Sequence, residues 1–277
     1  MISIIICSRK KSIPTQLVQN INRTIGIKSE LIIIDNSENI YSIFEAYNKG
    51  ILESKGDYLC FIHDDVIFHT ENWGTIINKV FESDSKIGLI GVAGSRVKSK
   101  MPSAWWECCQ EDLQINIIQH FPDRNEEHWQ KGSIENVVNV AIIDGVFMVA
   151  RKTNGIYFSK KLKGFHNYDM NLSFEYLKRG FKIVVTNDIL IEHYSLGTLN
   201  KSWYISTLNL HKIYNKMLPL NLSNSDLKEI EFKNGTKFIT ELLHLKMKKD
   251  AFFLWLKLIN HKTKSRFHYQ FLKQFFK

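Results

Sequence analysis

The sequence predicts an α/β protein with a mostly parallel central sheet, flanking helices and a C-terminal helical extension. Over residues 1–92, short apolar runs alternate with amphipathic helical patterns, which is typical of parallel strands joined by crossover helices. Acidic residues follow two of these runs, at Asp35 and at Asp64-Asp65, so they are expected at the carboxyl edge of the sheet, where open α/β sheets bind ligands. From Trp203 onward, apolar residues recur at helical spacing.

The elements of the first 92 residues follow from local patterns. Apolar runs too short for helices predict buried strands. The helices between them carry apolar residues on one face, and Ser12–Pro14 and Gly56 supply a helix start and a helix stop. The expected strands are 2–6, 31–34, 58–62 and 87–92, and the expected apolar helix faces are Ile13, Leu17 and Ile21; Ile43, Phe44, Tyr47, Ile51 and Leu52; and Trp73, Ile76, Ile77, Val80 and Phe81.

Regular patterning fades over residues 93–133, which contain Trp105 and Trp106. A span of that length without regular structure is uncommon in a compact domain unless it has a function. Beyond it, strands are expected at 137–143 and 146–150, around Asp144-Gly145, and again at 183–185 and 189–191, the last ending in Glu192-His193; a turn and a helix occupy 164–179.

The charge of the chain is concentrated at its C-terminal end. The net charge of the 277 residues is +9, and Lys246 to Lys277 contain nine basic residues and one acid, Asp250. A basic tail is suited to nucleic acid, to anionic lipid or simply to water. Its many aromatic residues suit a membrane interface; the alternative is a helical subdomain that packs on the catalytic part or on a second subunit.

The cysteines and the chain start indicate a reducing, cytosolic location. Cys7, Cys60, Cys108 and Cys109 lack metal-ligand spacing, and no charged leader precedes the first strand. No apolar run approaches the ~20 residues of a membrane-spanning helix.

Asp64 and Asp65 are adjacent carboxylates directly after the run Tyr58–Ile62 and His63. Two such charges repel one another unless a cation or a solvated turn relieves them. A divalent ion that itself holds a diphosphate is one solution. A solvated Asp-Asp turn is the other.

Five motifs, spread in order over roughly the first 200 residues, resemble those of GT-A glycosyltransferases of the family-2-like group. They are a strand into Cys7-Ser8-Arg9, the segment ending Asp35-Asn36-Ser37, Ala46-Tyr47-Asn48-Lys49-Gly50, Gly56-Asp57-Tyr58 leading to His63-Asp64-Asp65-Val66, and Gly164 to Leu172. The resemblance implies a Rossmann-like GT-A domain over residues 1–200, with a nucleotide-sugar half (1–92) and an acceptor half (93–200), before the basic extension (201–277).

The same resemblance implies the activity: a metal-dependent, inverting glycosyltransferase of the hexosyltransferase type. Such an enzyme transfers one sugar from a nucleotide-diphosphate donor to a glycan or lipid-linked acceptor, with Mn²⁺ or Mg²⁺ offsetting the charge of the leaving diphosphate. On this basis polysaccharide biosynthesis at the inner face of a membrane is the expected setting.

The donor-side roles come from the matched motifs. Asp65 is the expected metal ligand, Asp64 lies near the ribose or the metal, and His193 is a further candidate ligand, with a surface or core histidine as the alternative. Asp35 is expected to accept a hydrogen bond from the base, although Asp-Asn-Ser is also a common turn. Ser8, Arg9 and Asn48 are expected to border the nucleotide sugar.

Asp169 is the candidate general base, which takes a proton from the acceptor hydroxyl. The alternative role is an N-cap, because Asp169 stands before a helix expected over Met170–Arg179. The family usually has Glu-Asp here and Asp two residues later, whereas this chain has Tyr168-Asp169 and Asn171. Trp105 and Trp106 form a candidate acceptor platform or anchor their loop, and Asp144 and Gly145 are expected to border the acceptor.

Other functional classes fit less well. The Gln-x-x-Arg-Trp motif of processive synthases is absent. A sugar nucleotidyltransferase would need a glycine-rich loop after the first strand, and Cys7 to Ser12 contain no glycine. A nucleic-acid-binding protein would leave the strand-end carboxylates unexplained, and an inactive glycan-binding relative would not need the Asp64-Asp65 pair. We therefore expect no nucleic-acid partner, and the sequence leaves a homo-oligomer open.

Overall fold

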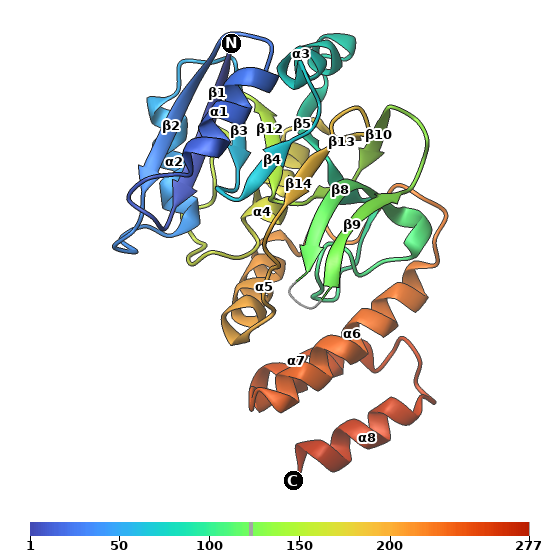
Figure 1. The fold of residues 1–277 in the computed structure, drawn as a ribbon. Helices are drawn as coiled ribbons and strands as arrows, with labels where there is room; N and C mark the ends of the chain where they lie inside the picture. Colours follow the sequence, from blue (N-terminus) through green and yellow to red (C-terminus); the bar gives the residue numbers. More distant parts are fainter. Residues whose placement is uncertain (122–123, 277) are drawn as a thin grey trace.

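The computed structural model describes residues 1–121 and 124–276 and shows a mixed α/β protein (Figure 1). Its strands are β1 (Ile2–Ser8), β2 (Ser29–Asp35), β3 (Tyr58–Ile62), β4 (Val66–Phe68), β5 (Ile87–Gly91), β6 (Ala93–Ser95), β7 (Val97–Lys98), β8 (Leu113–Phe121), β9 (Arg124–Lys131), β10 (Val137–Val140), β11 (Ile142–Ile143), β12 (Phe147–Arg151), β13 (Lys182–Thr186), β14 (Ile191–His193) and β15 (Leu220–Asn221). Its helices are α1 (Thr15–Thr24), α2 (Ile43–Glu53), α3 (Trp73–Ser83), α4 (Tyr168–Lys178), α5 (Lys201–Tyr214), α6 (Leu227–His244), α7 (Lys248–Leu258) and α8 (Arg266–Phe275), with a 3₁₀ turn at Gln110–Asp112.

The central sheet has seven strands in the order β10-β13-β5-β12-β3-β1-β2. β1 pairs in parallel with both β2 and β3, as predicted. β12 runs antiparallel between β3 and β5, so the sheet is mixed rather than mostly parallel. Residues 144–146 lead from β11 of the second sheet into β12, which enters the central sheet at the carboxyl end of β3, where Phe147 pairs with Ile62.

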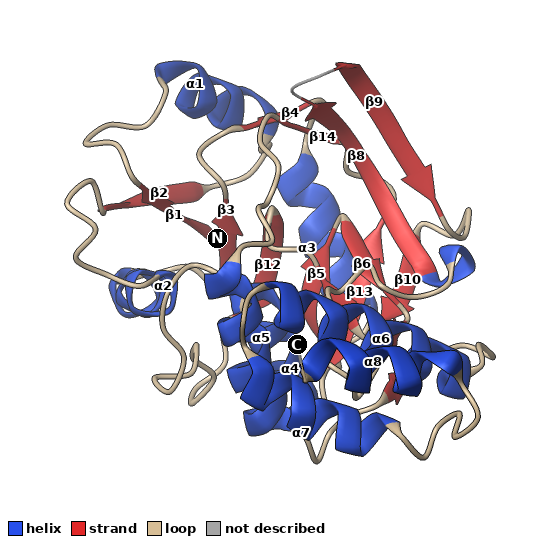
Figure 2. Cartoon of the chain, turned by 90° about the horizontal axis from the view of Figure 1, so that it is seen from below, coloured by secondary structure: helices blue, strands red, loops and turns tan. Residues whose placement is uncertain are grey.

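A second sheet contains much of the span expected to be irregular, so that expectation was wrong for residues 113–121 and 124–131. Its strand order is β11-β6-β8-β14-β4, with β9 beside β8 (Figure 2). The apolar residues Leu113, Ile115 and Ile117 alternate with polar ones along β8, and Gln114 and Asn116 are buried as well. Both faces of β8 are therefore covered.

Two further element boundaries differ from the prediction. Residues 137–143 form β10 and β11, which belong to different sheets. The strand expected at 189–191 begins at Ile191, and it lies in the second sheet, between β4 and β8. Leu52 was expected on the apolar face of α2, but its side chain is 75% exposed, while Ile51 is buried.

The chain after Lys201 is helical except for connecting segments and β15, which pairs with β7. α5 packs on the main core through Leu210 and Tyr214. α6, α7 and α8 lie side by side (Figure 2) and enclose a second apolar cluster, in which the Trp255 and Phe271 rings stack 4.8 Å apart. None of the helices described over residues 1–121 and 124–276 is both long and apolar enough to cross a membrane.

Candidate functional site

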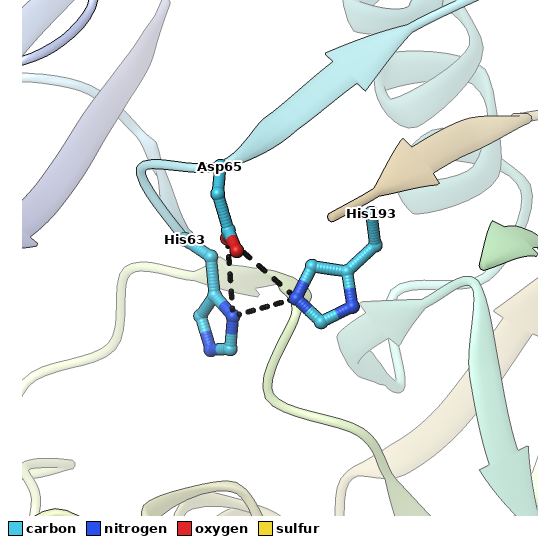
Figure 3. A group of neighbouring side chains, drawn as sticks. All are labelled: His63, Asp65 and His193. Carbon is cyan, nitrogen blue, oxygen red and sulfur yellow. Dashed lines mark hydrogen bonds and ion pairs between the residues drawn. The ribbon is translucent and has the colours of Figure 1, made fainter. Parts of the chain in front are cut away.

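Strand pairing brings His63, Asp65 and His193 together at the end of β3 (Figure 3). His63 and Asp65 lie in the short connection between β3 and β4. β14 runs antiparallel to β4, and its last residue, His193, pairs with Val66. The register of β14 on β4 therefore brings His193 next to His63 and Asp65, which lie about half of the chain away in the sequence.

The three side chains form a compact group of ligand atoms. One nitrogen or oxygen atom of each lies within 4.8 Å of the others. His193 Nε2 is 3.6 Å and His63 Nδ1 is 3.8 Å from Asp65 Oδ1, and the two nitrogens are 3.2 Å apart. Two imidazole nitrogens and one carboxylate oxygen suit a divalent transition ion.

His193 is held in a neutral state with a nitrogen lone pair toward this group. Burial, followed by the neighbouring His63, lowers the pKa of His193 to about 4. Its other nitrogen, Nδ1, lies 3.0 Å from Gln119 Oε1. Because Oε1 accepts hydrogen bonds only, Nδ1 carries the ring proton and Nε2 does not.

His63 is the member of the group to which sequence reasoning gave no role. The available signal was its position immediately before Asp64-Asp65, at the end of a buried strand. Its backbone N–H donates to the Val146 carbonyl at 3.3 Å, which fixes the start of the connection.

Three of the predicted donor-side residues share the edge next to this group. Ser8 is fully buried, and its Oγ donates to Asp64 Oδ2 at 2.6 Å. Asp35 ends β2 opposite Ser8 in the parallel register and is exposed. The backbone N–H of Ser37 donates to Asp35 Oδ1 and is the main cause of a lowered pKa at Asp35.

Arg9 and Asn48 are placed differently from those three. The Arg9 guanidinium lies over the Phe165 ring, 5.3 Å from its centre. The Asn48 amide makes two hydrogen bonds of 2.9 Å with the backbone of Phe158: its Nδ2 donates to the carbonyl, and its Oδ1 accepts from the N–H. Asn48 therefore joins α2 to a distant loop, and its amide is already used for that purpose.

On the acceptor side, Asp144 is connected to one of the predicted tryptophans. The Trp105 indole N–H donates to Asp144 Oδ2 at 2.7 Å. Trp105 is 8% exposed and Trp106 is 41% exposed, with their rings edge to face. Trp105 thus anchors the loop, and Trp106 presents an aromatic face to solvent.

Asp169 lies in the first turn of α4, which begins at Tyr168 and not at Met170 as expected. The residue in the N-cap position is Asn167, so Asp169 is not the N-cap. Its Oδ1 accepts from the Met170 N–H at 2.8 Å. Burial, and then the charge of Asp144, raise the pKa of Asp169 to about 7. A carboxylate with a pKa near neutrality is well matched to general base catalysis.

The loop that carries the two tryptophans is held by α6, a connection that sequence reasoning missed. The Glu231 carboxylate accepts from the backbone N–H groups of Lys100 and Met101. Asn234 Nδ2 donates to Ser99 Oγ at 2.9 Å and to the Glu107 carbonyl at 2.8 Å. These partners lie more than 120 residues apart, and local patterns contain no signal for such contacts.

Beneath this loop Lys98 is fully buried. Its Nζ donates to the Ser103 carbonyl at 3.0 Å. Burial lowers the pKa of Lys98 to about 7, although Glu107 and Glu231 act against that shift. The Lys98–Ser103 contact therefore ties the loop to the end of β7.

Comparisons with known proteins identify a matching family and solved structures of similar fold. The model of a family described as "Glycosyltransferase like family" matches residues 3–218. No curated protein matches the chain. Among solved structures, GalNAc-T7 with UDP, GalNAc and Mn²⁺ superposes with a TM-score of 0.54 at 11% identity, over 96% of this chain and 57% of that one. Residues 1–349 of S. aureus TarS with UDP give 0.52 at 14% identity, over 86% of this chain and 72% of that one.

These likenesses concern the fold. The chain spans little more than half of the length of the GalNAc-T7 chain that it matches. The likeness in fold confirms the GT-A class predicted from the sequence, with a central sheet that is mixed and not mostly parallel.

Proposed function

The chain belongs to the glycosyltransferase-like family, and we propose that it is a metal-dependent, inverting glycosyltransferase that adds one sugar to a glycan or lipid-linked acceptor. The observation that carries this proposal is the convergence of His63, Asp65 and His193 at the edge where Ser8, Asp64 and Asp35 also lie. Two structural neighbours crystallised with UDP support a uridine nucleotide donor.

The metal site would consist of His63, Asp65 and His193. Mg²⁺ prefers an all-oxygen octahedral shell, whereas imidazole nitrogens suit transition ions. The donor set therefore favours Mn²⁺ over Mg²⁺, in line with the Mn²⁺ of the GalNAc-T7 crystal. When bound, the ion supplies Lewis-acid stabilisation of the leaving diphosphate.

The donor-side residues orient the nucleotide. Ser8 fixes the Asp64 carboxylate at the end of β1, within the same edge as the metal group. Asp35, exposed at the end of β2, remains open to accept a hydrogen bond from the base. Arg9 borders this edge through its stacking on Phe165.

On the acceptor side, Asp169 would remove the proton from the attacking hydroxyl. The acceptor oxygen then forms its bond to the anomeric carbon while the bond from that carbon to the diphosphate oxygen breaks, and its electron pair leaves with the diphosphate. The proton ends on Asp169, whose pKa of about 7 allows it to be gained and lost near neutral pH. Attack from the face opposite the diphosphate inverts the anomeric configuration. Trp106 offers an aromatic face on which an acceptor sugar can stack.

The experiment that tests this function is a panel of UDP-sugars incubated with the protein and Mn²⁺, with UDP release as the readout. We expect release with one or two sugars, slow with water and faster with a suitable acceptor. A sugar nucleotidyltransferase would behave differently: it would form pyrophosphate from UTP and a sugar 1-phosphate and would not release UDP. That result would contradict the proposal.

We propose further that residues 1–200 form the catalytic domain and that the basic extension (201–277) contacts an anionic membrane at the inner face, where a lipid-linked acceptor resides. Much of its aromatic content is buried among α6, α7 and α8. Phe253, Leu256, Tyr269, Leu272 and Phe276 are exposed, in the segment from Lys246 to Lys277 that contains nine basic residues. Exposed apolar side chains among basic ones are suited to anionic lipid.

Replacing both Phe253 and Phe276 by serine should weaken binding to phosphatidylglycerol vesicles, and high salt should weaken it in the parent. Point changes are preferable to removal of residues 261–277, because loss of α8 would uncover Trp255. Ile134→Ser, at another exposed apolar position, is the matched control. If the parent does not bind vesicles and instead dimerises with rising concentration through these side chains, the exposed face is an interface between subunits.

A further inference from the structure

We infer that the Tyr168 hydroxyl is a positioning group that lets His63 act as a metal ligand. The inference rests on the proposed metal site. Tyr168 Oη lies 2.6 Å from His63 Nε2, the ring nitrogen that faces away from the metal group. Tyr168 is also the first residue of α4, and Asp169 is the next.

The donor and the acceptor of each hydrogen bond in this group can be assigned by beginning with the Gln119 amide. Its Nε2 donates to the carbonyls of His120, His193 and Ser195, at 2.9 to 3.2 Å. The amide oxygen therefore faces His193 Nδ1, and that nitrogen must be the donor. His193 Nε2 consequently carries a lone pair, which faces His63 Nδ1 at 3.2 Å and the Ser195 hydroxyl at 3.4 Å.

This result fixes the state of His63 when no ion is present. His63 Nδ1 lies 3.2 Å from His193 Nε2, which carries no proton, so Nδ1 carries the proton of this hydrogen bond and donates it. In the neutral His63 ring, Nε2 is then an acceptor, and it accepts from the Tyr168 hydroxyl.

Metal binding requires the opposite tautomer of His63. A nitrogen can bind an ion only through its lone pair, so Nδ1 must lose its proton to solvent and Nε2 must take one up, with no change in net charge. Nε2–H then donates to Tyr168 Oη. A hydroxyl can be donor or acceptor, so Tyr168 satisfies both tautomers, and it keeps its own proton throughout. Phenylalanine would satisfy neither.

The space around the hydroxyl supports this role. A Cβ atom at position 145 would lie 2.4 Å from Tyr168 Oη, so Gly145 leaves room for the hydroxyl. The Tyr47 ring meets the Tyr168 ring edge to face, with centres 5.6 Å apart. The Gly145 backbone N–H also lies near the Asp169 carboxylate and acts to lower its pKa. The turn at Gly145 therefore lies against both Tyr168, the partner of His63, and Asp169, the candidate base.

The test is Tyr168→Phe, with free Mn²⁺ counted by electron paramagnetic resonance in the presence of UDP. Groups that orient a metal-bound histidine are worth about 10–100-fold in metal affinity, and we expect a loss of that size. Tyr176→Phe is the matched control, because Tyr176 lies in the same helix and its hydroxyl donates to the Arg151 carbonyl at 2.7 Å. It should bind Mn²⁺ as the parent does.

A double-mutant cycle separates this role from a general loss of stability. On a His63→Ala background, Tyr168→Phe should cause no further loss of Mn²⁺ affinity, since it acts through His63. Equal Mn²⁺ affinity in Tyr168→Phe and the parent, or an undiminished loss on the His63→Ala background, overturns the inference alone. A parent that binds no Mn²⁺ overturns the proposed metal site, and this inference with it.

Discussion

Asp65→Ala is expected to abolish Mn²⁺-dependent UDP binding and to leave the fold intact. Asp65 supplies the only carboxylate oxygen among the three grouped ligand atoms, and both histidine nitrogens lie within 4 Å of it. Its removal leaves two neutral nitrogens and no anionic partner for the ion. The loss of Mn²⁺ affinity should therefore exceed the roughly 10–100-fold that is typical of groups that only orient the ligands.

Two control variants make the Asp65 result specific. Asp65→Asn keeps the size of the side chain and removes its charge, and it should lose Mn²⁺-dependent binding as well. Asp57→Ala removes an exposed carboxylate that pairs with the N-terminal amine, and it should bind like the parent. UDP binding that depends equally on Mn²⁺ in Asp65→Ala and the parent would show that the ion binds elsewhere.

Asp169→Asn should lower turnover by about 10²–10⁴-fold, the usual worth of a general base, with Mn²⁺ and UDP binding retained. Asparagine keeps the size of the side chain but cannot take the proton. In the parent, kcat/KM should rise with pH through about 7, where Asp169 ionises, and the residual activity of the variant should lack that rise. UDP release from the best UDP-sugar measures both.

The stability of this variant distinguishes a catalytic role from a structural one. The folded-state pKa of Asp169, about 7, lies above its ordinary value of 3.8. Its contribution to stability is therefore complete below pH 3.8 and is lost as the pH rises through about 7. At pH 8 the variant should melt no lower than the parent. Normal turnover in the variant would place the base elsewhere, and a product with retained anomeric configuration would exclude the inverting mechanism.

The part of the molecule that could be predicted from sequence is the part specified by short segments. β1 and β3 are runs of apolar strand formers, and the polar residues that end them stand beside them in the chain. The parallel alternation then places Ser8, Asp35 and Asp64 on one edge. For this reason the α/β class and the donor-side edge followed from local patterns and from the motifs.

The remainder depends on contacts between distant segments. His63 meets His193 through the register of β14 on β4, which no local pattern specifies. The strand β8 was missed because buried glutamine and asparagine side chains interrupt its apolar run, and their amides are satisfied by Asn187 and its neighbours. The loop around Trp105 is fixed by Glu231 of α6, in a segment that the sequence presents only as a basic extension.

The central claim is that this edge binds a nucleotide diphosphate through a metal ion, and calorimetric titration of the parent with UDP tests it most directly. With Mn²⁺ present we expect saturable binding at one site, and with the metal chelated we expect that binding to be lost or strongly weakened. UDP binding of equal strength with and without Mn²⁺, or no UDP binding under either condition, would contradict the account.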